Sequence, residues 1–535
     1  MLLITLYSLP RKYLILSFFA LLFFITTLIF VTRYTSDWSE FLEITEGHYN
    51  SLLASNRNSL FPSLHNVCYL DYAAAGIVSS YQTKRINSKL SNSLFINPHS
   101  SGESSLLIIR NEILDFFNAK EDYHVIFSSG ATSAIKILSD TFDFSDNSLF
   151  LYSTDNHVSI LGIRSKLSRH QWKGVSINQI IMTAIDHNQF LESNQLFNVL
   201  NLLAIPHQSN FDGSIINFEL IISQINSDCE KRGLLPWKLL LDSAGFVSSH
   251  HFDLQSFSTN QIDFIPISFY KMFGYPTGVG CLLVKKSSFS TLIQSNFGGG
   301  SVAFVAPQRN LIFRKSGEAG FELGTLSFAD IEFLKFGLDF LKIMDMKKIE
   351  NHSNYLTKYL RGKLSSLRHN NGLKLVQIHE NQSNLIVSRG PITTFNLLDN
   401  TDKYFPPKTI ATLALRQKIY LRTGALCNHG AFIENFNISE SEIIQKFEKG
   451  CTCDPNYCLK DQQLNSNSEI NSNKIENQIN VNTNCFGDFY SNGIPMSGVM
   501  RVSIGIATTF QDLQIFLKFI RSFLNQSIND CNDRL

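Results

Sequence analysis

The sequence predicts an α/β fold with a large, mainly parallel sheet, followed by a smaller α+β domain. Runs such as 237–241 (WKLLL) are apolar without alternation, which is typical of strands covered on both faces. Such runs alternate with helical patterns from about residue 68, the element order of an open parallel sheet. From about residue 311 longer helices come before a few further strands, which indicates a second domain.

Composition bounds the class of protein. The chain has 535 residues, of which 44% are hydrophobic, enough for the core of one large or two ordinary domains. The formal net charge is +1 and no long basic run is present, so we expect no nucleic-acid partner. Nine cysteines are too few and too unevenly placed for a disulfide scaffold.

The N-terminal region predicts a membrane anchor. Residues 13–31 read YLILSFFALLFFITTLIFV without a charge, and about 20 apolar residues cross a bilayer as a helix. We therefore predict a tail at 1–12, a single-pass transmembrane anchor at 13–32 and a linker at 33–65, with a signal sequence as the alternative. Basic residues flank the segment on both sides, so the side of the membrane that carries the catalytic body stays open.

Two domains are expected after the linker. We place a large domain at 66–310, with apolar strands near 123–127, 148–152, 238–242, 263–268 and 278–284. We place a small C-terminal domain at 311–535, with strands near 373–379, 383–389 and 500–506 and a last helix from 510. An asparagine-rich stretch at about 460–486 interrupts this domain and predicts a disordered surface insertion.

The stretch FSSGATSAIKIL (127–138) predicts a phosphate site. A strand ends at Phe127, Gly130 lies in the turn, and a helix follows. Amides at a helix N-terminus bind phosphate well, and Thr132 could add a hydroxyl. A simple helix cap would explain the same residues.

Two charged residues follow apolar runs later in the chain. Asp242 comes directly after LLL, at the strand end where ligands of open α/β sheets bind. Lys271, in SFYKMFGYPTG, follows the run FIPIS and precedes a turn rich in glycine and proline. A lysine in a desolvated site has a lowered pKa and becomes a nucleophilic amine. A structural ion pair for Asp242 and a surface position for Lys271 are the alternatives.

The order of these features is the one needed to hold pyridoxal phosphate (PLP). A phosphate-binding helix start is followed by His157 in DNHVSILGIR, then by Asp242, and then by Ser268 and Lys271. In PLP enzymes a lysine binds the aldehyde, a carboxylate pairs with the ring nitrogen, and a flat side chain stacks on the ring. Four weak signals in one order are less expected by chance than any one of them.

The chain resembles the class V aminotransferase family of PLP enzymes and, within it, the cysteine desulfurase domain of molybdenum cofactor sulfurases. The resemblance runs from about residue 66 to the end, apart from the asparagine-rich insertion. It rests on the stretches YLDYAAAG, NPHSSGESS, FSSGATSAIK, DNHVSILGIR, LLLDSAGFV, DFIPISFYKMFGYPTGVGCLLV, FGGGSV, FELGTLSFADI, LRTGALCNHGA and GIPMSGVMRVSIG. It implies a PLP-dependent transferase of fold type I.

The resemblance also implies residue roles. Lys271 would bind PLP covalently, Asp242 would pair with the ring nitrogen, and His157 would stack on the ring and act in proton transfer. The other implied contacts are to the phosphate (Gly130, Ala131, Thr132, Ser268), to the cofactor phosphate of a partner subunit in a homodimer (Ser301) and to the substrate (Asn97 and Arg501). Arg501 would bind the α-carboxylate of the substrate through both guanidinium nitrogens.

Cys427 lies in the loop RTGALCNHGA, where small residues let a thiol swing into an active site. Arg422 and His429 flank it and would favour the thiolate. The resemblance implies that Cys427 takes sulfur from L-cysteine as a persulfide. Ala425 and Phe432 stand where the family loop often has further cysteines, and a buried inert thiol is the alternative.

The predicted activity is therefore that of a PLP-dependent cysteine desulfurase acting on L-cysteine and releasing L-alanine. A selenocysteine lyase, an aminotransferase, and a catalytically silent membrane-tethered scaffold are the alternatives. Related sulfurases generally continue into a domain that binds molybdenum cofactor, which we expect to be absent because the chain ends 34 residues after Arg501. The sulfur acceptor, molybdenum cofactor or an acceptor protein, stays open.

A late group of cysteines has no clear assignment. Cys451, Cys453 and Cys458 form a C-x-C-x₄-C pattern, and Cys485 follows the insertion. Zinc ligands usually come as C-x₂₋₄-C pairs, so this spacing fits a zinc site poorly. Loop cysteines, a metal site and a sulfur relay all stay open, and we assign no metal ligand.

Overall fold

The structure is a computed structural model that describes residues 37–43, 51–97, 100, 104–257, 261–294, 296–442, 444, 490–491, 494–495 and 498–528. Residues 1–51 and 52–535 form two separate units. In the first unit, residues 37–43 are helical, and the rings of Trp38 and Phe41 lie 5.5 Å apart. The other elements described below lie in the second unit, except that α2 (Ser51–Leu60) begins with the last residue of the first unit.

The predicted membrane anchor is corrected. Within the described ranges, no helix has both the length and the apolar character needed to cross a bilayer, so the prediction of a single-pass membrane protein is not supported. The tail at 1–12 and the segment at 13–32 themselves lie outside the described residues. The same holds for the insertion at 460–486 and for Cys451, Cys453, Cys458 and Cys485.

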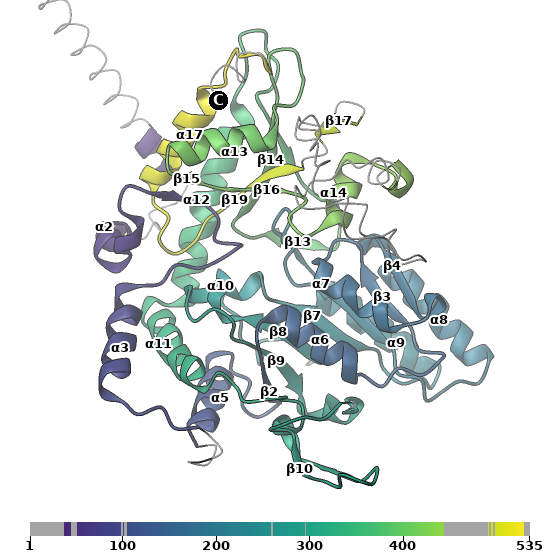
Figure 1. The fold of residues 1–535 in the computed structure, drawn as a ribbon. Helices are drawn as coiled ribbons and strands as arrows, with labels where there is room; N and C mark the ends of the chain where they lie inside the picture. Colours follow the sequence, from purple (N-terminus) through teal and green to yellow (C-terminus); the bar gives the residue numbers. More distant parts are fainter. Residues whose placement is uncertain are drawn as a thin grey trace, which may run out of the picture. The chain divides into compact units, whose positions relative to one another are not determined.

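A seven-stranded sheet forms the centre of the second unit (Figure 1). Six strands run parallel and β9 runs antiparallel to both of its neighbours, so the sheet is mainly parallel, as predicted, with one antiparallel strand. In spatial order the strands are β2 (Tyr123–Ser128), β9 (Gly280–Lys285), β8 (Phe264–Ser268), β7 (Lys238–Asp242), β5 (Leu202–Pro206), β3 (Phe150–Ser153) and β4 (Trp172–Val175).

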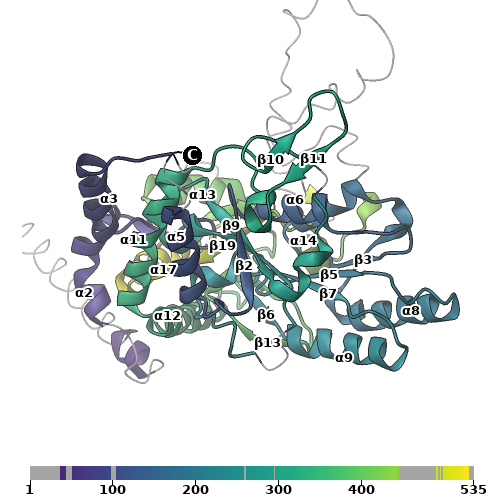
Figure 2. The ribbon, with the colours of Figure 1, turned by 90° about the horizontal axis from the view of Figure 1, so that it is seen from below.

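Both faces of this sheet are covered, which explains why its strands do not alternate apolar and polar residues. In β7, Leu239 and Leu241 join the core on one face, while Leu240 joins the core on the other. Figure 2 shows the strands between α6 (Ala131–Thr141) on one side and α8 (Ile180–Ser193) with α9 (Phe218–Lys231) on the other.

A second, four-stranded antiparallel sheet lies in the C-terminal part of the chain. Helices α12, α13 and α17 pack against its strands or against one another. In spatial order the strands are β12 (Val376–His379), β14 (Ile392–Leu397), β19 (Val499–Ser503) and β16 (Arg422–Gly424), and the helices are α12 (Met346–Ser366), α13 (Pro407–Arg416) and α17 (Phe510–Arg521). A further helix, α14 (His429–Phe436), follows β16 in the chain.

Elements on either side of the expected boundary at 310/311 pair with each other. β1 (Cys68–Tyr69) pairs with β15 (Ile419–Tyr420), and β6 (Ser214–Ile216) pairs with β13 (Ile386–Arg389). The division into domains at 66–310 and 311–535 therefore stays a prediction. The remaining elements are α2 (Ser51–Leu60), α3 (Ser80–Asn92), α5 (Ser104–Phe116), α7 (Val158–Leu161), α10 (Phe269–Phe273), β10 (Val302–Val305), β11 (Ile312–Arg314), α11 (Phe328–Met344), β17 (Tyr490–Ser491) and β18 (Ile494–Pro495).

Gly280 brings three chain segments close together at one edge of the large sheet. It starts β9 and lies in register with Ser128 of β2 and with Ser268 of β8. A Cβ atom at this position would lie 2.4 Å from Ile267 O and 2.5 Å from Gly130 Cα. Only glycine therefore lets the turn before α6 approach the end of β8.

Replacing Gly280 with alanine tests this constraint. We expect Gly280→Ala to lower the free energy of unfolding by about 1–3 kcal/mol, because the added methyl group overlaps two backbone segments. Urea unfolding followed by circular dichroism measures the change. Gly162→Ala is the control, since Gly162 has helical φ and ψ and its added Cβ meets no atom within 4 Å. Equal unfolding midpoints for the two variants would contradict the close approach.

Candidate active site

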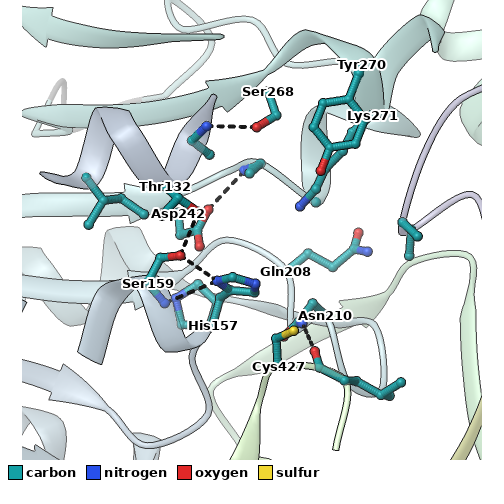
Figure 3. A pocket seen from close by; sticks show the side chains of 18 of the residues that line it. Thr132, His157, Ser159, Gln208, Asn210, Asp242, Ser268, Tyr270, Lys271 and Cys427 are labelled. Atoms are coloured by element: carbon teal, nitrogen blue, oxygen red, sulfur yellow. Dashed lines mark hydrogen bonds between the residues drawn. The ribbon is translucent and has the colours of Figure 1, made fainter. Parts of the chain in front are cut away.

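A cavity of about 190 Å³ lies where the carboxyl ends of β5, β7 and β8 meet the second sheet. Its lining joins segments that are far apart in the sequence, from Ala73 to Arg501. Figure 3 shows Asp242 and Ser268, from strand ends of the large sheet, and Cys427, from the loop after β16, around the same space. The carboxyl edge of an open α/β sheet is the usual place for a ligand.

The N-terminus of α6 forms one wall of the cavity. Gly130 precedes the helix with φ of 146° and, as a glycine, has no side chain of its own to cap the first turn. The Ser268 hydroxyl accepts a hydrogen bond from Ala131 N at 2.8 Å. Thr132 Oγ1 lies 2.8 Å from Ser159 Oγ. Two hydroxyls and a helix N-terminus suit an anion such as phosphate.

Lys271 and Asp242 face the cavity from neighbouring strand ends. Lys271 lies on α10, directly after β8, and Asp242 ends β7. Burial lowers the pKa of Lys271 from its ordinary value; the Asp242 carboxylate opposes this shift, and two arginines reinforce it. Asp242 Oδ1 accepts a hydrogen bond from Ala244 N at 3.1 Å. The sequence prediction of a desolvated lysine is consistent with this environment.

His157 is the N-cap residue of α7 and lies in the same cavity (Figure 3). Its Nδ1 accepts a hydrogen bond from Ser159 N at 3.2 Å, so the neutral ring carries its proton on Nε2. Burial lowers the pKa of His157, and Asp242 acts in the opposite direction. At neutral pH the imidazole is therefore favoured in its uncharged form, able to stack and to exchange a proton.

Two arginines face the cavity from adjacent strands. Arg422 and Arg501 are direct cross-strand partners in β16 and β19, and both line the cavity. Arg501 is buried, donates to Asn210 O at 2.8 Å and pairs with Asp71 at 3.2 Å. Its Nε has no hydrogen-bond partner among the described residues. The guanidinium is thus held in place by its two terminal nitrogens, while its Nε–H stays unpaired among the described residues.

Cys427 lines the cavity opposite Lys271, and its side chain is partly exposed. Arg422 Nη2 lies 3.6 Å from the Cys427 sulfur. The loop was expected to swing freely, but its backbone is held: Val158 N donates to Cys427 O at 2.9 Å. His429 starts α14 and is not among the cavity-lining residues, so Arg422 is the cation placed at the thiol.

The structure gathers most of the predicted site residues in this cavity. Lining it are Ala131, Thr132, His157, Asp242, Ser268, Lys271, Cys427 and Arg501, with Gly130 at the turn before α6. Asn97 and Ser301 do not line it. The Ser301 hydroxyl instead bonds with both the N–H and the carbonyl of Gly298, and the predicted roles of both residues stay predictions.

Sequence reasoning missed Gln208 and Asn210, which line the cavity after β5. They stand in the polar stretch HQSNFDG immediately after the buried run LLAIP. The same signal identified Asp242, a polar side chain directly after a buried strand. Asp71 was also missed: it lies in the quoted stretch YLDYAAAG, but only the fold shows that it meets Arg501.

Comparison with known proteins agrees with this geometry. A family model for aminotransferase class-V proteins matches residues 71–440. This chain belongs to the aminotransferase class-V family. Molybdenum cofactor sulfurases from Homo sapiens and Danio rerio are each 32% identical to it, covering 86% of this chain and 50% and 54% of the relatives. The chain therefore spans about half the length of these curated relatives.

Solved structures show the same fold at low identity. An apo cysteine desulfurase from Thermococcus onnurineus NA1 has a TM-score of 0.62 at 15% identity, covering 88% of this chain and 98% of its own. A C-DES variant with glycine covalently linked to its PLP cofactor has a TM-score of 0.58 at 15% identity, covering 87% of this chain and 99% of its own. These two likenesses support the predicted class of fold.

The electrostatic coupling between Asp242 and Lys271 is testable. In protein stripped of bound small molecules, we expect Asp242→Asn to lower the pKa of Lys271 further, because the carboxylate favours the charged amine. Competitive acetylation at a series of pH values, read by mass spectrometry, measures this pKa. Labelling of Lys84, an exposed residue of α3, should be the same in both proteins. A pKa that is unchanged or higher at Lys271 would contradict the coupling.

Proposed function

We propose that this protein is a PLP-dependent cysteine desulfurase of the molybdenum cofactor sulfurase type. It transfers sulfur from L-cysteine to Cys427 and releases L-alanine. The observation that carries the proposal is that an amine, a thiol and a carboxylate-binding guanidinium line one cavity: Lys271, Cys427 and Arg501. The relatives named molybdenum cofactor sulfurase support the same activity.

The residues present fit PLP. The absence of a Cβ at Gly130 and Gly280 leaves the α6 N-terminus close to Ser268. Two buried polar atoms of the cavity residues, Arg501 Nε and Gln208 Oε1, have no hydrogen-bond partner among the described residues. Three cations, Lys271, Arg422 and Arg501, line the space. The positive charge and the unpaired Arg501 Nε–H suit a ligand with a phosphate and a carboxylate.

Each part of the cofactor has a matching group. Ala131, Thr132 and Ser268 would hold the phosphate, Asp242 would pair with the ring nitrogen, and His157 would stack on the ring. Lys271 would supply the amine that binds the aldehyde. When bound, PLP supplies stabilisation of negative charge at the substrate α-carbon.

The chain's own residues would do the rest. Arg501 binds the α-carboxylate of L-cysteine, and Lys271 or His157, whose pKa values burial lowers, accepts the α-proton. The Cys427 thiolate, beside the Arg422 guanidinium, attacks the substrate sulfur. The carbon–sulfur bond breaks, a sulfur–sulfur bond forms, and the product takes up a proton to leave as L-alanine. The sulfur is then passed to molybdenum cofactor or to an acceptor protein.

A Cys427 variant tests the reaction. We expect Cys427→Ala to retain the absorbance of bound PLP and its response to L-cysteine, and to lose alanine formation by at least about a hundredfold, because no nucleophile remains. Mass spectrometry of the Cys427 peptide should show one added sulfur atom in the parent protein.

A substrate-binding variant gives the contrast. Arg501→Lys should raise KM for L-cysteine by about tenfold or more, since charge-assisted hydrogen bonds contribute roughly 1.5–3 kcal/mol, while saturating L-cysteine still loads Cys427. Desulfuration by Cys427→Ala at the parent rate would overturn the assigned nucleophile. A non-sulfur amino donor that is turned over in its place would point to an aminotransferase.

We also propose a homodimer, based on an exposed apolar hairpin. β10 and β11 form a two-stranded sheet that projects from the rest of the second unit (Figure 2). Phe304 and Phe313 are each more than half exposed there, and Phe297 and Leu311 nearby are also exposed. Exposed apolar groups of this kind mark interaction surfaces. Ser301 lies directly before β10 but is buried, with its hydroxyl bonded to Gly298, so its contact with a partner subunit's cofactor stays a prediction.

Disrupting this hairpin tests the dimer. We expect the double variant Phe304→Asp, Phe313→Asp to sediment as a monomer while the parent sediments as a dimer, because two charges would be buried in the contact. Val387→Asp is the matched control: Val387 is 60% exposed on β13 and should leave the dimer intact. A parent protein that is active as a monomer would refute the proposal.

A further inference from the structure

Asp155 is a buried carboxyl group just behind the Cys427 loop. It lies in the turn between β3 and α7, two residues before His157. Its Oδ1 accepts hydrogen bonds from Asn428 Nδ2 at 2.7 Å and from Ser209 Oγ at 2.8 Å. Its Oδ2 is buried and has no hydrogen-bond partner among the described residues.

Two asparagines link this carboxyl to the backbone next to the thiol. Asn428 caps α14 by accepting from Ala431 N at 3.2 Å, and its Nδ2 also donates to Asn210 Oδ1 at 2.9 Å. Asn210 Nδ2 in turn donates to Leu426 O at 2.7 Å, as seen beside Cys427 in Figure 3. A continuous path of side-chain hydrogen bonds therefore joins Asp155 to the residue before the nucleophile.

The loop needs such support because of its backbone. Leu426 and Cys427 have φ of 59° and 58°, two successive non-glycine residues in the left-handed region. This conformation costs roughly 1–2 kcal/mol per residue. It persists only where surrounding contacts hold it.

We propose that Asp155 is a positioning residue, the buried acceptor that holds the Cys427 loop in its left-handed conformation through Asn428 and Asn210. The inference rests on the proposed role of Cys427, and it assigns to Asp155 no contact with substrate or cofactor. Burial favours the neutral carboxylic acid, because ionisation would leave negative charge on the buried Oδ2, which has no hydrogen-bond partner among the described residues.

The charges around Asp155 also favour its neutral form. Burial raises the pKa of Asp155 to about 7, with the neighbouring carboxylates Asp212 and Glu434 acting in the same direction and Asn428 and Ser209 acting against it. Arg389 faces Asp212, at 2.7 Å, and partly offsets its charge. A carboxyl whose pKa is raised in the closed loop stabilises that loop fully below its ordinary pKa of 3.8. This stabilisation is lost as the pH rises to about 7.

Hydrogen exchange in the PLP-loaded protein measures the effect. The reporters are the amides of Val158, which donates to Cys427 O, and of Ala431, which donates to Asn428. Between pH 5.5 and 7.5, after correction for intrinsic exchange, we expect opening of the loop to increase about tenfold or more in the parent protein. Asp155→Asn should change by less than about twofold over the same range, because it cannot ionise.

Two further variants test whether Asp155 acts on the Cys427 loop through Asn428. Asn428→Ser keeps an N-cap for α14 but removes the amide that reaches Asp155, so it should also lose the pH dependence, even if Asp155→Asn fails to fold. Asp146→Asn, at an exposed position after α6, should behave like the parent. A parent loop without pH dependence, or an Asn428→Ser loop with the full dependence, overturns the proposal. Because exchange requires no turnover, this failure is distinguishable from failure of the proposed desulfurase activity.

Discussion

The contact among Gly130, Gly280 and the end of β8 determines the geometry of the cavity. Gly280 pairs with strands on both sides of it, so the ends of β2 and β8 are fixed relative to each other. Because neither glycine has a side chain, the turn before α6 approaches closely enough for Ser268 to bond Ala131 N. Lys271 follows one helical turn after Ser268, so the same contact sets the place of the amine relative to the helix N-terminus.

Electrostatics give this geometry a preference for anions. Lys271, Arg422 and Arg501 lie within reach of one another, and each arginine lowers the pKa of Lys271. Asp242 and Asp71 compensate in part, Asp71 through a direct pair with Arg501. Burial removes much of the water that would stabilise these charges. An anionic ligand would stabilise the buried cations in place of that water. The cavity is therefore better completed by a phosphate and a carboxylate than by water alone.

The sequence predicted those parts of the site that a short stretch encodes. The continuous apolar run before Asp242 placed this residue at a strand end, and the run FIPIS placed Lys271 one helical turn after a second strand end. Both predictions were possible because a strand buried on both faces appears in the sequence as a continuous apolar run. Gln208 had the same mark but was overlooked. The antiparallel direction of β9 and the meeting of Asp71 with Arg501 depend on tertiary pairing between distant segments. Asn97, grouped with the site by resemblance, does not line the cavity, and its substrate-binding role stays a prediction.

The nucleophile is held by polar side chains as well as by regular backbone structure. The left-handed pair Leu426 and Cys427 lies between β16 and α14, where it belongs to neither element. Hydrogen bonds from Asn210 and Val158 to its carbonyls each contribute about 0.5–1.5 kcal/mol, comparable with the backbone cost. Because the hydrogen-bond energy and the backbone cost are so similar, the loss of a single hydrogen bond would be enough to change the loop conformation. The position of the sulfur therefore depends on residues such as Asn210. Its side-chain amide donates to Leu426 O in the thiol loop, and its backbone carbonyl accepts a hydrogen bond from Arg501.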